Sequence, residues 1–145
     1  MNKEKIIFRR VEEKDLSQVF PLLQQLTEID YSNRDEKDCW NKFNSNTSSN
    51  SIVGLYEGEV IAYGGLVIEN KIRGEAAGHI EDIVVDNKAR GNNVGLMLID
   101  ELIKIAKEKR CYRVTLFCEE SLINFYDKNG FSVSGSAMKV HLDLL

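Results

Sequence analysis

The sequence predicts one α/β (α+β) domain over residues 1–145, in which a mixed central β-sheet is flanked by helices. Three observations support this fold class. Strand-like and helix-like segments follow one another in the order β-α-α-β-β-β-α-β-α-β. A strand, a loop and a helix at residues 78–106 precede another strand, and such a β-α-β unit places its strands parallel, whereas the short turn at residues 57–59 requires an antiparallel pair. No internal repeat or linker divides the chain, and its length suits a single core.

The N-terminal segment predicts a strand followed by an amphipathic helix. Residues 6–11 are strand-like, and acidic residues at positions 12, 13 and 15 favour the positive end of a helix that starts there. The stripe that this helix buries is expected to be Leu16, Val19, Phe20, Leu23 and Leu26. Pro21 lies inside that pattern and should kink the helix or break it in two.

The next segments predict a short helix, a loop and a hairpin. The helix is expected at residues 35–43, and the polar residues 44–51 are interpreted as a mobile surface loop. Residues 51–56 and 60–68 are the strands of the hairpin, with a glycine in its turn. Consecutive glycines at positions 64 and 65 indicate a bend or a close backbone approach within the second strand.

The chain is organised around a strand, a loop and a helix start at residues 78–97. The β-branched residues 83–85 fit a buried strand, and apolar residues recur at helical spacing from Leu98 to Ala106. Between them, residues 90–95 form a Gly/Asn-rich loop at a helix N-terminus, where unpaired N–H groups and the positive end of the helix dipole can hold a phosphate. An ordinary strand–turn–helix crossover explains the loop equally well when it is taken alone.

The end of the chain predicts three further elements. They are a strand at residues 112–118, a short helix at 121–129, and terminal strand segments at 131–133 and 137–142. Ser121 is expected to cap the short helix at its N-terminus, and Gly130 is expected to close it.

The composition is that of a globular protein without a surface for nucleic acid. Apolar residues make up 43% and charged residues 29%, a globular balance, and the net charge of −4 argues against a nucleic-acid surface. No apolar run approaches the ~20 residues of a membrane span, and no signal peptide is recognised, so a cytoplasmic protein is expected. Three unpatterned cysteines are expected to be reduced thiols, and two histidines without a C-x-x-C motif give no metal site.

The loop resembles one from a known class of enzymes. Arg90-x-x-Asn93-x-Gly95 is similar to the pyrophosphate loop of the GCN5-related N-acetyltransferase (GNAT) superfamily, usually written Arg/Gln-x-x-Gly-x-Gly/Ala. Asn93 stands at the first glycine of that pattern. Asparagine tolerates a left-handed backbone better than other non-glycine residues, so the loop can survive the change.

A narrower resemblance covers nearly the whole chain. Gly-His-Ile-Glu-Asp-Ile-Val-Val at 78–85, Leu-Ile-Asp-Glu-Leu at 98–102, Cys-Tyr-Arg at 111–113 and Asn-Phe-Tyr-Asp-Lys-Asn-Gly-Phe at 124–131 resemble the glucosamine-6-phosphate N-acetyltransferases. The resemblance is weakest at residues 29–51. It implies a GNAT fold with a splayed pair of parallel strands, and acetyl-CoA as cosubstrate. It also implies glucosamine 6-phosphate as acceptor, a place in the synthesis of UDP-N-acetylglucosamine, and a homodimer.

The resemblance also assigns site residues, position by position. The cofactor-binding set would be Ile83, Val84, Val85, Arg90, Gly91, Asn92, Asn93, Val94, Gly95, Leu96, Phe117 and Tyr126. The substrate-binding set would be Thr27, Lys71, Ile72, Arg73, Gly74, Glu81, Asp82 and Ile83, with a contribution from a second subunit. Catalysis would fall to Tyr126, Glu81 and Asp82, with Tyr126 donating a hydrogen bond or a proton to the departing thiolate. His141 stands where the family usually has an arginine near coenzyme A.

Elementary chemistry gives reasons for these roles. An attacking amine becomes cationic as the tetrahedral intermediate forms, so Glu81 or Asp82 could orient it, stabilise its charge or pass its proton to water. Adjacent strand residues point to opposite faces, so both carboxylates cannot serve one task unless a bulge reorients one of them. Lys71 and Arg73 suit a substrate phosphate, although a solvated loop explains them as well. Tyr126 could likewise be a core residue.

Two other functions are compatible with the sequence. The chain could be a GNAT acetyltransferase for another amine, such as a polyamine, an aminoglycoside or a protein N-terminus. Lys71 and Arg73 argue against the acidic groove that a polyamine needs. The chain could also be an acyl-CoA-binding sensor without turnover, although its carboxylates and Tyr126 argue for an enzyme. Release of the coenzyme A thiol would separate the two classes.

Overall fold

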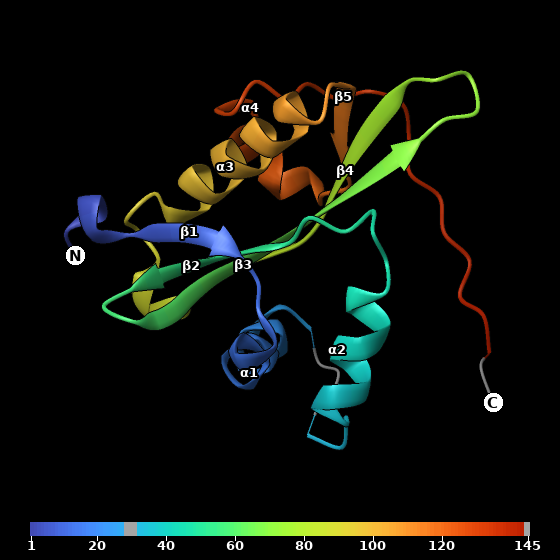
Figure 1. The fold of residues 1–145 in the computed structure, drawn as a ribbon. Coiled ribbons are helices and arrows are strands. Elements are labelled where there is room, and N and C mark those ends of the chain that lie inside the picture. Colours follow the sequence, from blue (N-terminus) through green and yellow to red (C-terminus); the bar gives the residue numbers. More distant parts are fainter. Residues whose placement is uncertain (28–31, 144–145) are drawn as a thin grey trace.

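A five-stranded sheet runs through the computed structural model, which describes residues 1–27 and 32–143 (Figure 1). In spatial order the strands are β1 (Ile7–Arg10), β2 (Ile52–Tyr56), β3 (Glu59–Asn70), β4 (Ala76–Val85) and β5 (Cys111–Leu116). Neighbours are antiparallel as far as β4, whereas β4 and β5 are parallel. The predicted mixed sheet is confirmed, and so is the β2–β3 turn, where Glu57 and Gly58 have φ of 51° and 83°.

Helices cover both faces of the sheet. They are α1 (Leu16–Leu26), α2 (Glu36–Asn44), α3 (Val94–Glu108) and α4 (Ile123–Asp127), with short 3-10 turns at Lys3–Lys5, Glu13–Asp15, Asn87–Ala89 and Glu120–Leu122. Figure 1 shows α1 and α2 on one face and α3 and α4 on the other. The crossover between the parallel strands β4 and β5 is α3, as parallel pairing requires. Within the described ranges, no helix has the length and apolar character that crossing a membrane requires.

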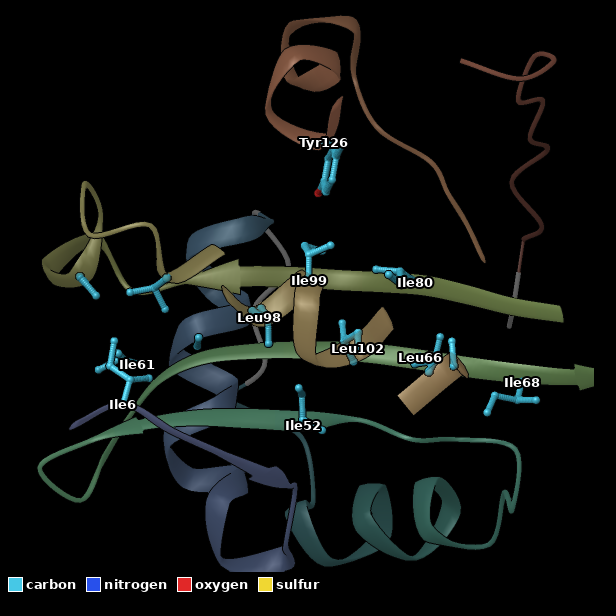
Figure 2. Packing of buried hydrophobic residues seen from close by; sticks show 14 residues of the cluster. Ile6, Ile52, Ile61, Leu66, Ile68, Ile80, Leu98, Ile99, Leu102 and Tyr126 are labelled. Carbon is cyan, nitrogen blue, oxygen red and sulfur yellow. The ribbon is translucent and has the colours of Figure 1, made fainter. Parts of the chain in front are cut away.

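The larger core lies between the sheet and α3. Leu66 of β3 and Leu98, Ile99 and Leu102 of α3 are fully buried there (Figure 2). Helical spacing puts the α3 residues on one face, which meets the sheet. A smaller cluster on the α1 face comprises Val11, Val19, Leu22, Val53, Val60 and Val84. Because both faces of the sheet are covered, the backbone of β4 is held where the site residues are predicted.

An ion pair between the partly exposed Arg9 and the buried carboxylate of Asp15 fixes the start of α1. The two carboxylate oxygens of Asp15 accept hydrogen bonds from the Arg9 guanidinium at 2.8 and 2.7 Å, and the Glu12 N–H donates another at 2.7 Å. Asp15 is 2% exposed. The hydrogen bond from Arg9 holds the pKa of this carboxyl below its usual range despite the opposing effect of burial.

Replacing Asp15 by alanine should lower the free energy of unfolding by about 2–3 kcal/mol, because Arg9 and the Glu12 N–H lose their acceptor. Since the folded-state pKa is depressed, the carboxylate stabilises the fold above the unfolded-chain pKa of about 3.9, and this contribution is lost as the pH falls through the folded value. Urea titrations near neutral pH and near pH ~3 measure this. The difference in unfolding free energy between variant and wild type should be smaller at the acid pH. An equal difference at both pH values would contradict this role.

The first helix departs from its prediction in two ways. Pro21 does not break α1, which continues through it from Leu16 to Leu26. Packing of the helix on the sheet offsets the hydrogen bond that proline cannot donate. The buried stripe includes Leu22, which the prediction omitted, whereas Leu26 is 50% exposed because the helix ends there.

The polar residues 44–51 are not a mobile loop throughout. The Asn50 N–H donates to the Leu66 carbonyl at 2.7 Å, and the Ile68 N–H donates to the Ser48 carbonyl at 2.9 Å, so this segment follows β3. Ser51 is buried, with 4% of its surface exposed. Polar composition concealed this pairing because it uses backbone groups, which every residue carries.

The short helix near the C-terminus begins later than predicted. Ser121 lies in a 3-10 turn, and α4 starts after Leu122 without a side-chain cap, so the predicted Ser121 cap is wrong. The predicted end of this helix at Gly130 is confirmed. Gly130 has φ of 91°, and its N–H donates to the Asp127 carbonyl at 2.9 Å.

The predicted terminal strands at 131–133 and 137–142 are absent from the described chain. The segment instead forms a tail that runs away from the sheet beyond β5 (Figure 1). Met138 and Val140 on this tail are 97% and 81% exposed. A strand needs a partner as well as a suitable pattern, and residues 131–143 pair with no strand of the described chain.

Candidate active site

The parallel strands β4 and β5 separate partway along their length. Their last paired residues are Ile80 and Leu116. Beyond them β4 continues to Val85, whereas the chain leaves β5 through Phe117, which is 71% exposed. Along residues 83–85, the N–H and C=O groups that face this gap can pair with an extended ligand. The splayed pair implied by the resemblance is therefore present.

A β-bulge lies where the gap opens. The register between β3 and β4 shifts here, so that Gly64 alone faces both Asp82 and Ile83. Asp82 has φ of 53°, a left-handed conformation that aspartate tolerates better than most residues. Ile80 and Ile83 both pack in the α3-side core, which regular alternation forbids for residues three apart. Because of the bulge, the Asp82 side chain is not forced onto the face of the sheet opposite that of Glu81.

The two glycines of β3 permit this geometry. A Cβ on Gly64 would lie 2.8 Å from Ile83 Cδ1, and one on Gly65 would lie 3.2 Å from the Glu81 carbonyl oxygen. The close backbone approach predicted for positions 64 and 65 is confirmed at Gly65, where a larger residue would press on the backbone of Glu81. A larger residue at Gly64 would instead displace the end of the Ile83 side chain.

Both carboxylates lie on the α1 side of the sheet. Glu81 points there because its neighbour Ile80 points into the opposite core. Asp82 lies within electrostatic range of Tyr63, and Tyr63 packs in the α1-face cluster. Burial raises the pKa of the Tyr63 phenol, a hydrogen bond with Ser51 lowers it, and the Asp82 charge raises it. Tyr63 and Ser51 were not predicted as site residues, because only long-range pairing brings them to the bulge.

The loop before α3 has the backbone of an anion site. Gly91 and Asn93 have φ of 84° and 58°, so asparagine adopts the left-handed conformation expected of it. The Asn92 amide donates to the Arg90 carbonyl at 3.3 Å and steadies the turn. Val94 begins α3, and the N–H groups of a first turn have no partner within the helix. These groups fit a pyrophosphate, as binding of acetyl-CoA would require.

Gly95 joins this loop to α4. A Cβ there would lie 2.8 Å from Phe125 Cζ, so glycine lets the first turn of α3 approach α4. The Asn129 amide donates to the Leu96 carbonyl at 3.2 Å. These contacts tie α4, and with it Tyr126, to the start of α3.

Tyr126 is buried on the α3 side of the sheet. It is 9% exposed and packs edge-on against Phe125 and Phe131, with ring centroids 4.9 and 6.1 Å away. Figure 2 shows its hydroxyl pointing from α4 toward the sheet. Burial raises the pKa of the phenol, and nearby Cys118 raises it further. Such a phenol keeps its proton at neutral pH and can donate it.

The predicted cations lie apart from the predicted carboxylates. The turn between β3 and β4 contains Lys71, Ile72, Arg73 and Gly74. From Ala76 to Glu81 alone, β4 spans about 17 Å at ~3.3 Å per residue. One protomer therefore does not gather the substrate-binding set in one place.

Thr27 lies at the other end of β4, on the α1 side. It is the C-cap residue of α1, and its N–H donates to the Leu23 carbonyl at 3.2 Å. Gln25 accepts a hydrogen bond from the Asn87 N–H at 3.1 Å, which ties this helix end to the loop after β4. Residues 28–31, which include the start of the segment of weakest resemblance, lie outside the described residues. His141 lies on the exposed tail.

Comparison with known proteins identifies relatives over most of the chain. The acetyltransferase (GNAT) family model matches residues 16–131. The chain is 34% identical over 125 residues to glucosamine 6-phosphate N-acetyltransferase 1 of Dictyostelium discoideum, which covers 83% of this chain and 80% of that one. It is 33% identical over 137 residues to the glucosamine 6-phosphate N-acetyltransferase of Candida albicans, covering 90% and 92%. The crystal structure of glucosamine-6-phosphate N-acetyltransferase from Arabidopsis thaliana matches with a TM-score of 0.86 and 30% identity, over 95% and 99% of the two chains.

The opened parallel pair, the bulge and the loop before α3 define an N-acetyltransferase of the GNAT class, whose cosubstrate is acetyl-CoA. An aminoglycoside acetyltransferase from a soil metagenome shares this fold, with a TM-score of 0.85, but only 16% of the sequence, so the likeness is one of fold alone. Within the class, the chain belongs to the family of glucosamine 6-phosphate N-acetyltransferases. Among the residues that the structure describes, no three His, Cys, Asp or Glu side chains gather as a metal site.

Proposed function

We propose that the protein transfers the acetyl group of acetyl-CoA to the amine of glucosamine 6-phosphate. The observation that carries this proposal is the opened β4–β5 pair, with two carboxylates on one side of the sheet and a buried tyrosine on the other. The acceptor follows from the relatives, which are named as glucosamine 6-phosphate N-acetyltransferases.

The residues around the gap would divide the reaction between them. Acetyl-CoA supplies the acetyl group as a thioester; the edge of residues 83–85 would hold its pantetheine arm, and the loop before α3 its pyrophosphate. Glu81 and Asp82 orient the neutral amine from the α1 side and stabilise the positive charge that develops on it. The Tyr126 hydroxyl gives its proton to the departing thiolate. The amine attacks the thioester carbon directly and the carbon–sulfur bond breaks, so the protein is not acylated. The surplus proton on the nitrogen passes to water through one of the two carboxylates.

A coenzyme A release assay with several acceptors tests this function. Thiol release from acetyl-CoA should depend on glucosamine 6-phosphate and be far weaker with glucosamine, because the phosphate contributes to binding. Mass spectrometry should detect N-acetylglucosamine 6-phosphate. Release with an aminoglycoside, a polyamine or a peptide N-terminus, but not with the sugar phosphate, would assign another amine. Binding of acetyl-CoA without release would indicate a sensor.

We also propose that the active unit is a homodimer. A hexosamine phosphate is much shorter than the ~17 Å that β4 spans between the hairpin turn and the carboxylates. The tail also exposes Val133, Met138, Val140 and Leu142, at 72%, 97%, 81% and 75%. A second copy that covers the tail and brings its hairpin to the site would account for both features. Sedimentation equilibrium should then give twice the monomer mass, and a monomer would contradict the proposal.

Replacing Lys71 by alanine should raise the KM for glucosamine 6-phosphate about tenfold and leave that for acetyl-CoA little changed, because one charged contact to the phosphate is lost. Steady-state kinetics with each substrate varied measure this. An unchanged KM for glucosamine 6-phosphate would show that Lys71 is not part of the substrate site. Mixing Lys71→Ala and Tyr126→Phe subunits should restore activity in a shared site, because each mixed dimer then contains one intact set of residues.

We further propose a cytoplasmic enzyme that acts in UDP-N-acetylglucosamine synthesis. Cys39, Cys111 and Cys118 are free thiols, as is usual in a reducing compartment. Burial raises the pKa of the Cys111 thiol, which keeps it protonated and unreactive. Cell fractionation tests the location.

A further inference from the structure

We propose that His79 and Glu69 position the ammonium group of Lys71 for the substrate phosphate, a role that rests on the function proposed above. A chain of hydrogen bonds links these side chains to β5. His79 Nδ1 lies 2.6 Å from Thr115 Oγ1, and His79 Nε2 lies 3.0 Å from Glu69 Oε2. Lys71 Nζ donates to the other carboxylate oxygen, Glu69 Oε1, at 2.9 Å. The four residues therefore form one connected path from the sheet to the hairpin turn.

The partners fix the protonation of this path. A carboxylate only accepts hydrogen bonds, so His79 Nε2 must carry the proton that it gives to Glu69. The hydrogen bonds from Lys71 and then from His79 hold the pKa of Glu69 below its usual value. The carboxylate is thus charged at neutral pH and joins two donors, each through a charge-assisted bond.

The path anchors a turn residue to paired backbone. His79 of β4 pairs directly with Thr115 of β5 and with Val67 of β3, two residues before Glu69. Lys71 lies in the turn, yet its side chain is only 21% exposed, against 58% for Arg73 beside it. Hydrogen bonds between β3, β4 and β5 fix the backbone of these strands. The side chains of His79 and Glu69, which the strands carry, can therefore hold Lys71 in position.

A lysine held in this way is suited to an anion. Its long side chain has many rotamers, and restricting them before binding removes part of the ordering cost. Glu69 takes one of the three ammonium hydrogens, and two can be given to phosphate oxygens. Residues from Glu69 to Arg73 line an open pocket of about 320 Å³ at this point. The pocket is where a partner subunit's sugar phosphate would meet the ammonium group.

Steady-state kinetics of His79 variants test the positioning role. His79→Phe keeps a ring but removes both nitrogens, and should raise the KM for glucosamine 6-phosphate about fivefold without changing kcat or the KM for acetyl-CoA. His79→Gln, whose amide can still donate to Glu69, should restore most of this affinity. In a Lys71→Ala background, His79→Phe should add nothing, because it acts only through Lys71. Thr115→Val removes the hydrogen bond at His79 Nδ1 but keeps the contact between Nε2 and Glu69, so it should raise the KM for glucosamine 6-phosphate by less than His79→Phe does.

Each outcome bears on the proposal. If His79→Phe raises both KM values, or has its full effect without Lys71, His79 is merely structural and the positioning role is wrong. If its kinetics match those of the wild type in an enzyme that uses glucosamine 6-phosphate, the positioning role is wrong and the proposed function stands. A wild-type protein that does not use the sugar phosphate would overturn both. Nitrogen NMR of the His79 ring should show a proton on Nε2, and its absence there would contradict the path without any turnover measurement.

Discussion

Tyr126→Phe should lower kcat by about 10²-fold or more, because a positioned general acid typically contributes 10²–10⁴-fold. The change removes only the hydroxyl, while the ring contacts with Phe125 and Phe131 remain. Affinity for acetyl-CoA should change little, because its proposed contacts come from residues 83–85 and from the loop before α3. Steady-state kinetics and calorimetric titration with acetyl-CoA measure the two quantities separately.

The raised pKa of Tyr126 sets the pH range of this effect. Burial and then Cys118 favour the protonated phenol, so the hydroxyl keeps its proton until above its ordinary pKa of about 10. The defect of the variant should therefore be constant through the neutral range. Cys118→Ser is a matched control beside the same ring, and its kcat should stay within about twofold of wild type. Normal turnover by Tyr126→Phe would pass the acid role to water or another group.

Parts of the fold that depend on local constraint were predictable from sequence. The β2–β3 turn, the left-handed Asn93 and the parallel β4–β5 pair each follow from a conformational preference or from a short connection. The tail at residues 131–143 marks the limit, because its pattern predicts strands but does not say which strand would pair with them. Residues 44–51 show the converse, since their pairing with β3 leaves no trace in composition.

The candidate site divides in the same way. Adjacent acids in an apolar strand drew attention to Glu81 and Asp82, together with the condition that a bulge would be needed for both to share a task, and the bulge is present. Their neighbour Tyr63 could not be found, because β-sheet register is not a local property. The path through His79 joins residues 10 and 36 positions apart, and no short motif encodes such a contact.

The bulge makes Asp82 the carboxylate whose replacement should be most costly. Asp82→Asn should lower kcat/KM for the amine substrate by about 10²-fold, because it removes the charge that stabilises the developing cation. Asparagine tolerates the φ of 53° as well as aspartate does, so the bulge should survive. Acetyl-CoA binding should be unaffected, and calorimetry can confirm this in the same sample.

Three further variants and readouts locate the effect. Glu81→Gln makes the same chemical change one residue away. It should lower kcat/KM by less, because Glu81 pairs regularly with Gly65 and lies outside the bulge. Asp82→Ala should lose about 1 kcal/mol of stability as well, since alanine disfavours the left-handed region. Removing the Asp82 charge should lower the pKa of Tyr63, which ultraviolet titration detects without turnover. If the variant has a lowered Tyr63 pKa and full activity, Asp82 lies near Tyr63 but is not catalytic. The catalytic role would then pass to Glu81, because no other carboxylate was predicted at the opening of the gap.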